Sequence, residues 1–472
     1  MLIPGSLDSI LKSFKCDTQK SHFPYKAVNK KSLYYIGKKP DKKFYNNISD
    51  KEYLAIPENG WSLNSETLKY LKSDVEGLLE AVKKFNNNIF NKYQLNITKY
   101  KTLPSLTLAV YTSSYIPNNL KFELKMIKGD LEREIRSSYF GGNVDVFINE
   151  INKGYYYDMN SQYSKAMLND MPVGSPILSL ENNLNNIFGF VYGEITCPDE
   201  QTLQVPFIQY KDSLCRLNNC SRGSFKRLIF SEEIKYAIKF GYTINIEYCY
   251  IFERGKDLFK EYVNYHYDLK KLSEDPIEKT MAKLFLNYLY GRMGMKEIDS
   301  TIDILDITEA KELDKTNNVT IFSQLGNNKV LVKYSDKIPY NIKKLLKTNN
   351  QDFTDSKFKK LNKTQLKELD LFKKRGVPSA VHIASAIAAY ARILINEFKN
   401  IPGNPCIMSD TDSVIWTSPL PEELIGNELG LMKLEYNIKK AIIIRKKLYY
   451  ILTQDNQVVI KASGKDSSKL NY

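Results

Sequence analysis

Two short stretches decide the fold of this chain: YYYDMNSQYS at residues 155–164 and CIMSDTDSVIW at residues 406–416. In each stretch, an apolar or aromatic run ends in an acidic turn, which is the pattern of a β-strand that leads into a loop. Asp158 ends the first run, and Asp410 and Asp412 end the second. Carboxylate oxygens are the hard ligands that Mg²⁺ prefers in proteins. These three aspartates are therefore the candidate ligands of a divalent metal.

Asp410 and Asp412 alternate along the sequence, so a strand through both would point both carboxylates to one face. Acidic groups packed this closely repel one another, which raises some of their pKa values unless a cation is bound. An Asp-Thr-Asp run is by itself also common in hydrogen-bonding turns. The choice between a turn and a metal site therefore depends on the other motifs.

A third stretch, KLFLNYLYG at residues 283–291, has the spacing of a helix. Lys283, Asn287, Tyr290 and Gly291 fall along one helical face. A lysine there can meet a phosphate, a tyrosine can stack on a base or sugar, and a glycine leaves room for a ligand. An exposed lysine beside a core tyrosine is the structural alternative. The pattern as a whole favours a nucleotide pocket.

Two further stretches have features suited to nucleic acid. The paired glycines of SYFGG, residues 138–142, permit a positive φ and the close approach of another backbone, so a tight turn is the simplest interpretation. IIIRKKLYYI, residues 442–451, predicts one strand in which Lys447 and Tyr449 share a face. A basic strand with an aromatic neighbour suits a phosphodiester backbone. Cations at a strand edge also prevent edge pairing, which is the competing explanation.

Apolar spacing predicts two long helices. Residues 66–86 predict an amphipathic helix with Tyr70 and Asp74 on one face and an apolar stripe of Leu68, Leu71, Val75, Leu78, Leu79 and Val82. Residues 378–398 predict a helix with a small-residue face of Ala380, Ala384, Ala388 and Ala391. Between them, residues 217–282 have a basic, helical pattern. Residues 296–375 are rich in Lys, Asn and Asp with weak periodicity, as in a solvated excursion.

The composition excludes several classes of protein. The chain has 472 residues, 43% of them hydrophobic, which is enough for two or more domains and a large core. No apolar run reaches the roughly 20 residues of a membrane span, and six scattered cysteines support neither a disulfide framework nor a zinc site. A formal net charge of +14 favours a nucleic acid partner.

The N-terminal sequence lacks the features of a signal or transit peptide. Abundant Lys, Asn, Ile and Tyr fit an AT-rich coding genome. We therefore expect an organelle-encoded mitochondrial protein, with a viral or phage gene as the alternative, and no membrane partner.

In this order, the stretches around Asp158, Asn287 and Asp410 resemble motifs A, B and C of family B DNA polymerases. The finer spacing is similar to that of the protein-primed branch found in phages and linear mitochondrial plasmids. The resemblance implies an α+β fold in which an antiparallel palm sheet carries helical fingers. It also implies truncation at both ends, with a partial exonuclease at the N-terminus and most of the thumb missing.

The resemblance implies a domain layout. Residues 1–100 are expected to be the remnant of a 3′–5′ exonuclease and residues 101–472 the polymerase domain. The expected subdivisions of the polymerase are a palm at 139–216 and 376–464, fingers at 217–296 and an insertion at 297–375. The insertion occupies the position of the subdomain that encircles the template in this family.

The resemblance also implies roles for individual residues. It makes Asp158, Asp410 and Asp412 the catalytic ligands of two Mg²⁺ ions, with Mn²⁺ as a substitute. The implied nucleotide contacts are Tyr163, Lys271, Lys283, Asn287, Tyr290 and Gly291. The implied DNA contacts are Tyr139, Gly141, Gly142, Lys447 and Tyr449. Tyr70 and Asp74 match an exonuclease motif, and because its partner carboxylates are missing we expect no exonuclease activity.

The implied partners are a DNA primer-template, deoxynucleoside triphosphates and a terminal protein that serves as primer. Tyr163 follows Asp158 at the position where this family excludes a 2′-hydroxyl, which predicts deoxynucleotide substrates. Two functions remain open. The chain is a template-directed DNA polymerase that replicates a linear plasmid or viral genome by protein priming, or it is a decayed remnant that at most binds DNA.

Overall fold

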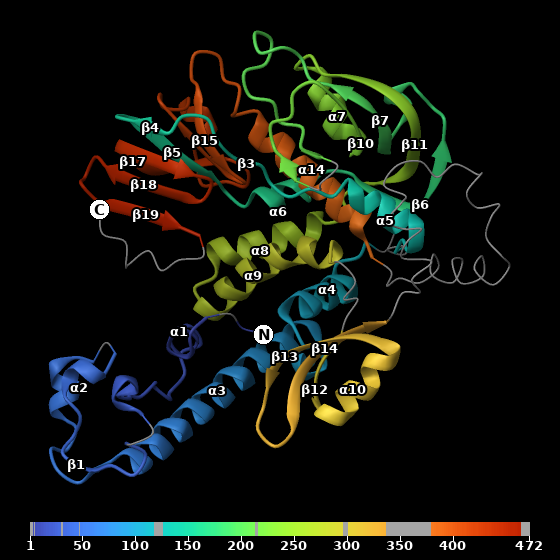
Figure 1. Cartoon of the computed structure of the whole chain (residues 1–472). Helices are drawn as coiled ribbons and strands as arrows, with labels where there is room; N and C mark the ends of the chain where they lie inside the picture. The colour runs from blue at the N-terminus through green and yellow to red at the C-terminus, as the bar shows by residue number, and fades with distance from the viewer. Residues whose placement is uncertain are drawn as a thin grey trace. The chain divides into compact units, whose positions relative to one another are not determined.

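The computed structural model describes residues 3, 5–29, 32–46, 48–117, 126–212, 216–295, 301–336 and 379–463. The chain divides into two compact units. Unit 1 comprises Met1–Pro117 and Phe259–Arg292, and unit 2 comprises Asn118–Leu258 and Met293–Tyr472. Figure 1 shows the elements of each unit along the chain.

Unit 1 is mostly helical. Its longest element, α3, carries a two-stranded ladder at its N-terminal end and packs with α4, α8 and α9 through its C-terminal half. The elements are α1 (Leu7–Ser13), η1 (Tyr25–Ala27), β1 (Ile36–Gly37), η2 (Lys42–Phe44), α2 (Asp50–Leu54), β2 (Trp61–Ser62), α3 (Leu63–Tyr93), η3 (Ile97–Lys99), α4 (Leu103–Ser114), α8 (Lys260–Leu272) and α9 (Pro276–Met293).

Helix α3 confirms the predicted helix and extends it at both ends, but the predicted apolar stripe is wrong. Its side chains are largely exposed, with Leu68 62% and Val75 57% accessible. The buried face instead carries Gly77, Ala81 and Phe85 among others. The small side chains there let α1 approach closely, since a Cβ on Gly77 would lie 3.1 Å from Leu11. α1 packs against this face of α3, so this face is buried. The apolar spacing of α3 alone gives no information about that partner.

A cluster of aromatic rings joins α8 and α9 to α3 and α4. Tyr93 of α3 hydrogen bonds His266 of α8 at 3.1 Å, and Tyr111 of α4 packs on Phe259 with ring centroids 5.0 Å apart. Burial lowers the pKa of His266 to about 4, so this imidazole is neutral at physiological pH. An ion pair from Lys92 to Glu278 at 2.5 Å adds a link to α9.

The expected helical segment from Leu217 to residue 296 is only half helical. Before Lys260 the segment forms mainly strands, with one helix between them, because β10 (Ser224–Phe230) and β11 (Thr243–Gly255) pair on either side of β7 (Gly189–Thr196). Alternating burial along β10 shows the two-residue period that the basic composition obscured. With β6 (Met171–Ser179) these strands make a sheet of order β10-β7-β11-β6, covered by α7 (Ser231–Ile238).

The principal sheet of unit 2 has eight antiparallel strands. Its order is β19-β18-β17-β5-β16-β15-β3, with β4 paired to β17. The strands are β3 (Val144–Val146), β4 (Glu150–Ile151), β5 (Gly154–Met159), β15 (Cys406–Asp410), β16 (Ser413–Trp416), β17 (Met432–Arg445), β18 (Leu448–Thr453) and β19 (Val458–Ala462). The predicted strand at Asp158 and the predicted hairpin around Asp410 are both present in it.

Helix α14 (Val381–Asn396) is the central support of unit 2 and confirms the predicted alanine-rich helix. It contacts α5 (Gly129–Ser137), α6 (Gln162–Ala166), α7 and strands of the four-stranded sheet (Figure 1). Its last turns join a core with Tyr157, Trp416 and Met432 of the principal sheet. Nearly every residue of α14 is buried, because sheets and helices surround it.

Part of the predicted solvated excursion is folded. β12 (Thr301–Asp306), β13 (Asn317–Gln324) and β14 (Lys329–Asp336) form a sheet of order β12-β14-β13, and α10 (Ile307–Thr316) covers it. The small core contains Ala310, Val330 and Val332. Residues 297–300 and 337–375 of the expected insertion lie outside the described residues.

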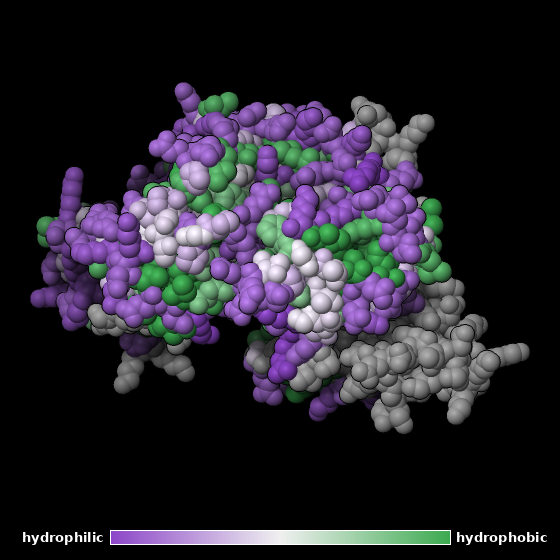
Figure 2. Space-filling model, turned by 90° about the horizontal axis from the view of Figure 1, so that it is seen from above, coloured by the Kyte–Doolittle hydropathy of each residue, from purple (hydrophilic) through white to green (hydrophobic). Residues whose placement is uncertain are grey.

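The surface is mainly polar. Figure 2, a view from above, shows hydrophilic residues over most of the visible face with smaller apolar patches between them. Within the described ranges, no helix combines the length and the apolar character that crossing a membrane requires.

A buried ion pair fixes the glycine-rich loop that follows α5. Arg392 of α14 binds both carboxylate oxygens of Glu233 in α7, at 2.6 and 2.7 Å, and both side chains are about 1% exposed. The same guanidinium donates to the main-chain oxygens of Phe140 at 2.6 Å and Gly141 at 3.2 Å. A bidentate pair of this kind holds its partners in one orientation. The loop is thereby tied to two helices.

The two loop glycines differ in their surroundings. A Cβ on Gly142 would lie 2.5 Å from Cγ2 and 3.0 Å from Cα of Thr411, the turn residue between Asp410 and Asp412, whereas a Cβ on Gly141 would meet nothing within 4 Å. Neither glycine has a positive φ, so the turn expected of them is wrong. The close approach of another backbone, the second property considered, is what Gly142 provides.

We predict that Gly142→Ala destabilises the protein by about 1–3 kcal/mol, because the added methyl overlaps Thr411 in a fixed turn. Thermal unfolding of the full chain measures this. Gly141→Ala is the matched control and should leave the unfolding temperature nearly unchanged. Equal effects of the two substitutions would contradict the assigned contact.

Candidate active site

Three strands of the principal sheet align the candidate carboxylates. The Cα of Asp158 in β5 is paired with that of Ser413 in β16, and Ser413 is paired in turn with Asp410 in β15. Residues directly opposite one another in an antiparallel sheet point to the same face. Asp158 and Asp410 therefore flank Ser413 in one row, on one face of the sheet.

Asp412 lies in the turn between β15 and β16 and not in a strand, so the predicted alternation with Asp410 is wrong. Thr411 adopts a left-handed conformation with φ of 63°, which reverses the chain directly after Asp410. The Asp412 N–H donates to the Asp410 oxygen at 2.8 Å, and the Asp412 oxygen accepts from the Met159 N–H at 2.8 Å. These main-chain bonds fix Asp412 beside the end of β5.

Gln162, at the start of α6, stabilises this turn through hydrogen bonds of its side chain. Its side-chain amide donates to the main-chain oxygens of Thr411 at 3.1 Å and Ala391 at 2.8 Å, and the residue is 2% exposed. Thr411 also donates its own N–H to the Asn143 oxygen at 2.8 Å. The acidic turn is thus linked to α6, α14 and the glycine-rich loop.

The carboxylates perturb one another. Burial, followed by the negative charge of Asp412, raises the pKa of Asp158 to about 7. Burial also raises the pKa of Asp412, with Asp410 contributing repulsion. A carboxyl group titrating near neutral pH next to two others is the electrostatic state that a bound cation relieves.

Two tyrosines of the principal sheet lie beside the row formed by Asp158, Ser413 and Asp410. The Tyr156 hydroxyl donates to Ser413 Oγ at 2.9 Å and lies 3.4 Å from the Tyr449 hydroxyl. Tyr449 is 5% exposed and belongs to the core with Ile438 and Ile451. Its position is therefore structural, and its contact with DNA stays a prediction.

Lys447 lies in a hairpin turn, so the predicted continuous strand is wrong. β17 ends at Arg445, which pairs with Leu448 of β18, and Lys447 between them has a left-handed φ of 59°. Its ammonium reaches Asp410, with Nζ 2.8 Å from Oδ1 and 3.2 Å from Oδ2. The lysine expected to hold a primer thus neutralises a candidate metal ligand.

The three carboxylates would fill only part of the coordination shell of Mg²⁺, and substrate and water would supply the rest. In the portion of the chain that the structure describes, no three His, Cys, Asp or Glu side chains form a ready ligand group. Mg²⁺ commonly takes one or two protein carboxylates and completes its shell with water and substrate phosphates. Asp158, Asp410 and Asp412 supply that open kind of site, and burial together with the charge of Asp412 raises the pKa of Asp158, an effect that a bound cation would oppose.

The predicted nucleotide contacts of α8 and α9 belong to unit 1, whereas the three aspartates belong to unit 2. Lys283 and Asn287 are exposed on α9, while Phe285, Leu286 and Leu289 on the other side are buried. Tyr290 is half-buried, and a Cβ on Gly291 would meet nothing within 4 Å. The predicted common face therefore exists. Lys271 is exposed near the end of α8, on a separate helix from Lys283.

The remaining predicted contacts are half-buried. Tyr163 lies on α6, next to Gln162, and Tyr139 precedes the glycine-rich loop. The Tyr139 ring occupies the space where a Cβ on Gly294 would lie, at 2.7 Å. These positions leave both predicted roles untested.

Tyr70 and Asp74 lie one turn apart on α3, as predicted. The Tyr70 hydroxyl hydrogen bonds Tyr25, and burial together with hydrogen bonds to Tyr25 and Asp74 raises its pKa. Asp74 Oδ1 is buried without a hydrogen-bond partner among the described residues. The absence of exonuclease activity stays a prediction.

Sequence patterns missed two residues that organise the site, Gln162 and Arg392. Arg392 is a charged residue inside an apolar helical pattern, whereas Gln162 lies among polar residues and gives no such signal, and both are almost fully buried. A buried polar side chain needs a partner, so such positions signal a specific contact. The partner itself cannot be deduced from spacing.

The antiparallel sheet with acidic strand ends, a supporting helix and a glycine-rich loop defines a polymerase palm. The chain belongs to the family of organellar and viral type B DNA polymerases, whose sequence model matches residues 1–399. It is 39% identical to a probable DNA polymerase of Agaricus bitorquis, covering 100% of this chain and 60% of that protein. It is 32% identical to one of Podospora anserina, covering 98% and 39%. The chain thus spans less than two thirds of either relative.

Solved structures confirm the predicted fold. Phi29 DNA polymerase complexed with primer-template DNA and incoming nucleotides matches with a TM-score of 0.65 and 18% identity, covering 98% of this chain and 72% of that one. Phi29 DNA polymerase complexed with single-stranded DNA matches with a TM-score of 0.62. At this identity the likeness is one of fold.

We predict that Asp158→Asn raises the unfolding temperature more at pH 8 than at pH 5. The folded pKa of about 7 exceeds the ordinary value of 3.8, so the stability that the protonated carboxyl group contributes is lost as the pH rises from 3.8 through about 7. The amide mimics the protonated form and removes that loss. Thermal unfolding at both pH values measures it, with Asp170→Asn, at an ion pair to Arg254, as control. A gain independent of pH would contradict the assignment.

We predict that Lys447→Ala tightens Mn²⁺ binding by up to about fivefold, since a partly exposed ion pair is worth roughly 0.2–1 kcal/mol. Titration followed by the electron paramagnetic resonance of free Mn²⁺ measures this directly. Lys446→Ala is the matched control, because Lys446 pairs with Asp145 at 3.2 Å instead. Unchanged Mn²⁺ affinity in Lys447→Ala would show that the contact with Asp410 does not compete with the cation.

Proposed function

We propose that the chain is a template-directed DNA polymerase that joins deoxynucleotides to a primer 3′ end. The alignment of Asp158 and Asp410 on either side of Ser413, with Asp412 in the adjoining turn, supports this most strongly. Family membership supports the same reaction class. Protein priming, replication of a linear plasmid or viral genome, and a mitochondrial or viral setting belong to this proposal.

In the proposed mechanism Asp158, Asp410 and Asp412 hold divalent metal. Two Mg²⁺ ions, with Mn²⁺ as a substitute, would supply positive charge for the entering and leaving oxygens of phosphoryl transfer. The protein's own share is placement. The β5-β16-β15 register fixes two carboxylates, and the bonds of Thr411 and Asp412 fix the third.

Charged and aromatic side chains complete the proposal. Lys283 of α9 contacts the triphosphate as a point charge, and Asn287, Tyr290 and Gly291 line the nucleotide pocket, with Lys271 as an additional phosphate contact. Tyr163 lies under the sugar and excludes a 2′-hydroxyl. Exposed Lys447, which pairs with Asp410 in this structure, binds the primer phosphate, and its long, flexible side chain can reach either partner from the hairpin turn.

The template side of the proposal rests on the glycine-rich loop. Tyr139, Gly141 and Gly142 contact the template strand, and Arg392 keeps their loop in place through its bonds to Phe140 and Gly141. The exposed and open position of Gly141 leaves room for a phosphodiester backbone. The primer-template is thus expected to touch the loop that also supports the acidic turn.

We predict that extension of a labelled primer falls by orders of magnitude in Asp410→Ala and Asp412→Ala, because the metal then loses a ligand. The assay uses four deoxynucleotides with Mg²⁺ or Mn²⁺, with and without a terminal protein. Glu150→Ala, in β4 of the same sheet, is the control carboxylate. DNA binding without any extension by the wild-type chain would favour the second candidate, a decayed polymerase that only binds DNA.

We predict that Tyr163→Val admits ribonucleotides in the same assay, since the smaller side chain leaves space for a 2′-hydroxyl. The measured quantity is the ratio of extension with ribonucleotides to extension with deoxynucleotides. Tyr155→Val, in β5, is a control for loss of an aromatic ring in the palm. An unchanged ratio in Tyr163→Val would remove this residue from the nucleotide pocket.

A further inference from the structure

Unit 2 contains a buried lysine that forms no ion pair with a described carboxylate. Lys399, just beyond the C-terminal end of α14, is 3% exposed. Asp145 is among its electrostatic neighbours, but that carboxylate already has other partners. Its Oδ1 lies 3.2 Å from the Lys446 ammonium, and its Oδ2 accepts a hydrogen bond from the Cys220 thiol at 3.2 Å. A buried charge without a counter-charge is unfavourable, which favours the uptake of a counter-ion from solution.

Ser409 of β15 adds a hydroxyl group to the surroundings of this lysine. Its Cα is paired with that of Asp145 in β3, so both side chains lie on one face of the principal sheet. Val414 of β16, opposite Ser409, belongs to the same face and packs in a core with Ile395 of α14. Ser409 is 1% exposed, and its Oγ has no hydrogen-bond partner among the described residues. A buried hydroxyl on the face of the sheet that α14 covers therefore needs a partner.

Asn396, the last residue of α14, adds an amide group. It is 1% exposed, and within the described part of the chain neither its Oδ1 nor its Nδ2 has a hydrogen-bond partner. The Lys399 N–H donates to its main-chain oxygen at 3.1 Å, so the two residues lie one turn apart. Arg392, one turn earlier on the same side of the helix, is already bound to Glu233. The amide and the ammonium are thus the polar groups of this side that need a ligand.

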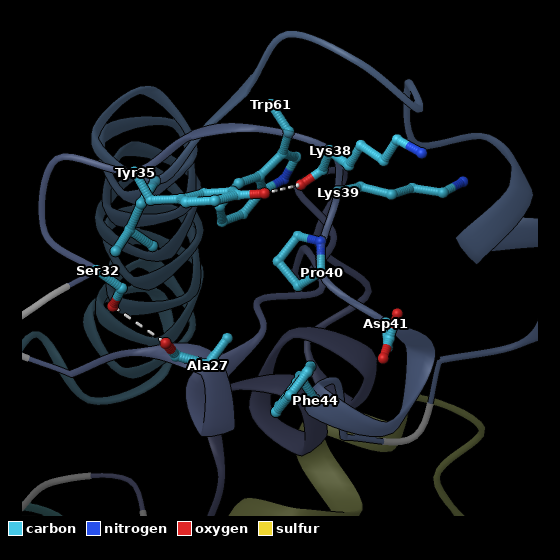
Figure 3. A pocket seen from close by; sticks show the side chains of 10 residues that line it. Ala27, Ser32, Tyr35, Lys38, Lys39, Pro40, Asp41, Phe44 and Trp61 are labelled. Atoms are coloured by element: carbon cyan, nitrogen blue, oxygen red, sulfur yellow. Dashed lines mark hydrogen bonds between the residues drawn. The ribbon is translucent and has the colours of Figure 1, made fainter.

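The cavity of unit 1 shows how buried polar groups are ordinarily satisfied. It has a volume of about 350 Å³, and hydrogen bonds within the protein hold its lining (Figure 3). The Tyr35 hydroxyl donates to the Lys38 oxygen at 2.9 Å, and the Ser32 hydroxyl donates to the Ala27 oxygen at 3.0 Å. The buried amide and hydroxyl groups near Lys399 have no such partners. This difference indicates a ligand in unit 2.

We propose that Lys399, Asn396 and Ser409 bind a small monovalent anion, for which chloride is the probe, between the end of α14 and the principal sheet. An ammonium, an amide NH₂ and a hydroxyl are all hydrogen-bond donors, and a monatomic anion can accept from all three. The thiols of Cys220 and Cys406, also neighbours of the lysine, do not repel an anion, because burial raises the pKa of each to about 12. The anion stabilises the junction between α14 and the strand that leads into the acidic turn. The site does not depend on the polymerase reaction, so a chain that fails to extend primers still tests it.

Thermal unfolding of the full chain in sodium chloride and in sodium gluconate, at equal ionic strength, tests this site. Gluconate is too large to enter a buried site of this kind. We expect chloride to raise the unfolding temperature of the wild type by about 1–3 °C relative to gluconate, because it binds the folded state alone. Lys399→Met keeps the length of the side chain without its charge and should lose this difference, and Ser409→Ala should reduce it. Lys439→Met, at an exposed lysine of β17 in the same sheet, is the matched control and should retain it.

Two further measurements separate a bound anion from a general salt effect or from misfolding. In gluconate, Lys399→Met should unfold at the wild-type temperature or above, since it removes a buried charge. Bound chloride broadens the chloride NMR signal, and the part of the broadening that Lys399→Met removes measures binding at this site directly.

The effect of chloride should also weaken between pH 7 and pH 10. Burial lowers the pKa of Lys399 to about 8, and the neutral amine that forms above this pH does not attract an anion. Of its charged and titratable neighbours, Cys406 and Cys220 stay protonated over this range, whereas Asp145 and Arg392 are held in ion pairs. Equal unfolding temperatures of the wild type in the two salts, an undiminished chloride effect in Lys399→Met, or an undiminished effect at pH 10 would overturn the proposal.

Discussion

The backbone of unit 2 holds three carboxyl groups close together in a partly buried place, and much of the surrounding structure serves this arrangement. Asp158, Asp410 and Asp412 come from two strands and a turn, and burial, followed by the charge of Asp412, raises the pKa of Asp158 to about 7. Free side chains would move apart. Here the strand register, the main-chain bonds of Asp412 and burial prevent this, so the electrostatic strain is retained in the folded state. A cation that binds between these carboxylates relieves their repulsion, and this relief makes its binding free energy more favourable.

Maintaining that strain explains several contacts that otherwise look unrelated. Gln162 fixes the Thr411 oxygen, Gly142 allows Thr411 to lie against the loop backbone, and Arg392 fixes the loop itself. All three act on the same left-handed turn. Hydrogen bonds from buried polar side chains orient the elements that they join, which is a more specific effect than burial of apolar surface. Helix α14 connects these contacts. It carries Arg392, and its Ala391 main-chain oxygen accepts a hydrogen bond from the Gln162 side chain.

The sequence was sufficient to predict the elements with a strong local signal. These elements are the strand ending at Asp158, the hairpin at Asp410 and the alanine-rich helix α14. In each of them, the apolar pattern of the sequence agrees with the burial that the structure shows. The predictions that failed concern positions where one residue changes direction. Thr411 and Lys447 both adopt positive φ, and neither is a residue type that commonly does so. Each therefore turned an expected strand into a turn.

Tertiary contacts account for the other differences. The apolar stripe of α3 predicted a buried face, but the close fit of α1 against Gly77 decided the orientation, and only the partner helix shows this. The strands β10 and β11 each carry two consecutive charged residues, Lys226-Arg227 and Glu253-Arg254, which interrupt the alternation of apolar and polar residues. For the candidate site, the identity of the aspartates followed from sequence, whereas the row through Ser413 required the strand order. Strand order depends on pairings between segments more than 200 residues apart, such as β5 with β16.

The charged groups of the site differ in how firmly the structure holds them. Strand pairing and main-chain hydrogen bonds fix the backbone of the three aspartates. Lys447 lies on a two-residue hairpin turn, its side chain is 51% exposed, and one ion pair holds it. A divalent cation held by Asp410 would compete with this ammonium, because both would bind the same carboxylate oxygens. Asp410 thus has a counter-ion that can move, and its place on an exposed hairpin turn between β17 and β18 would let it meet a phosphodiester backbone.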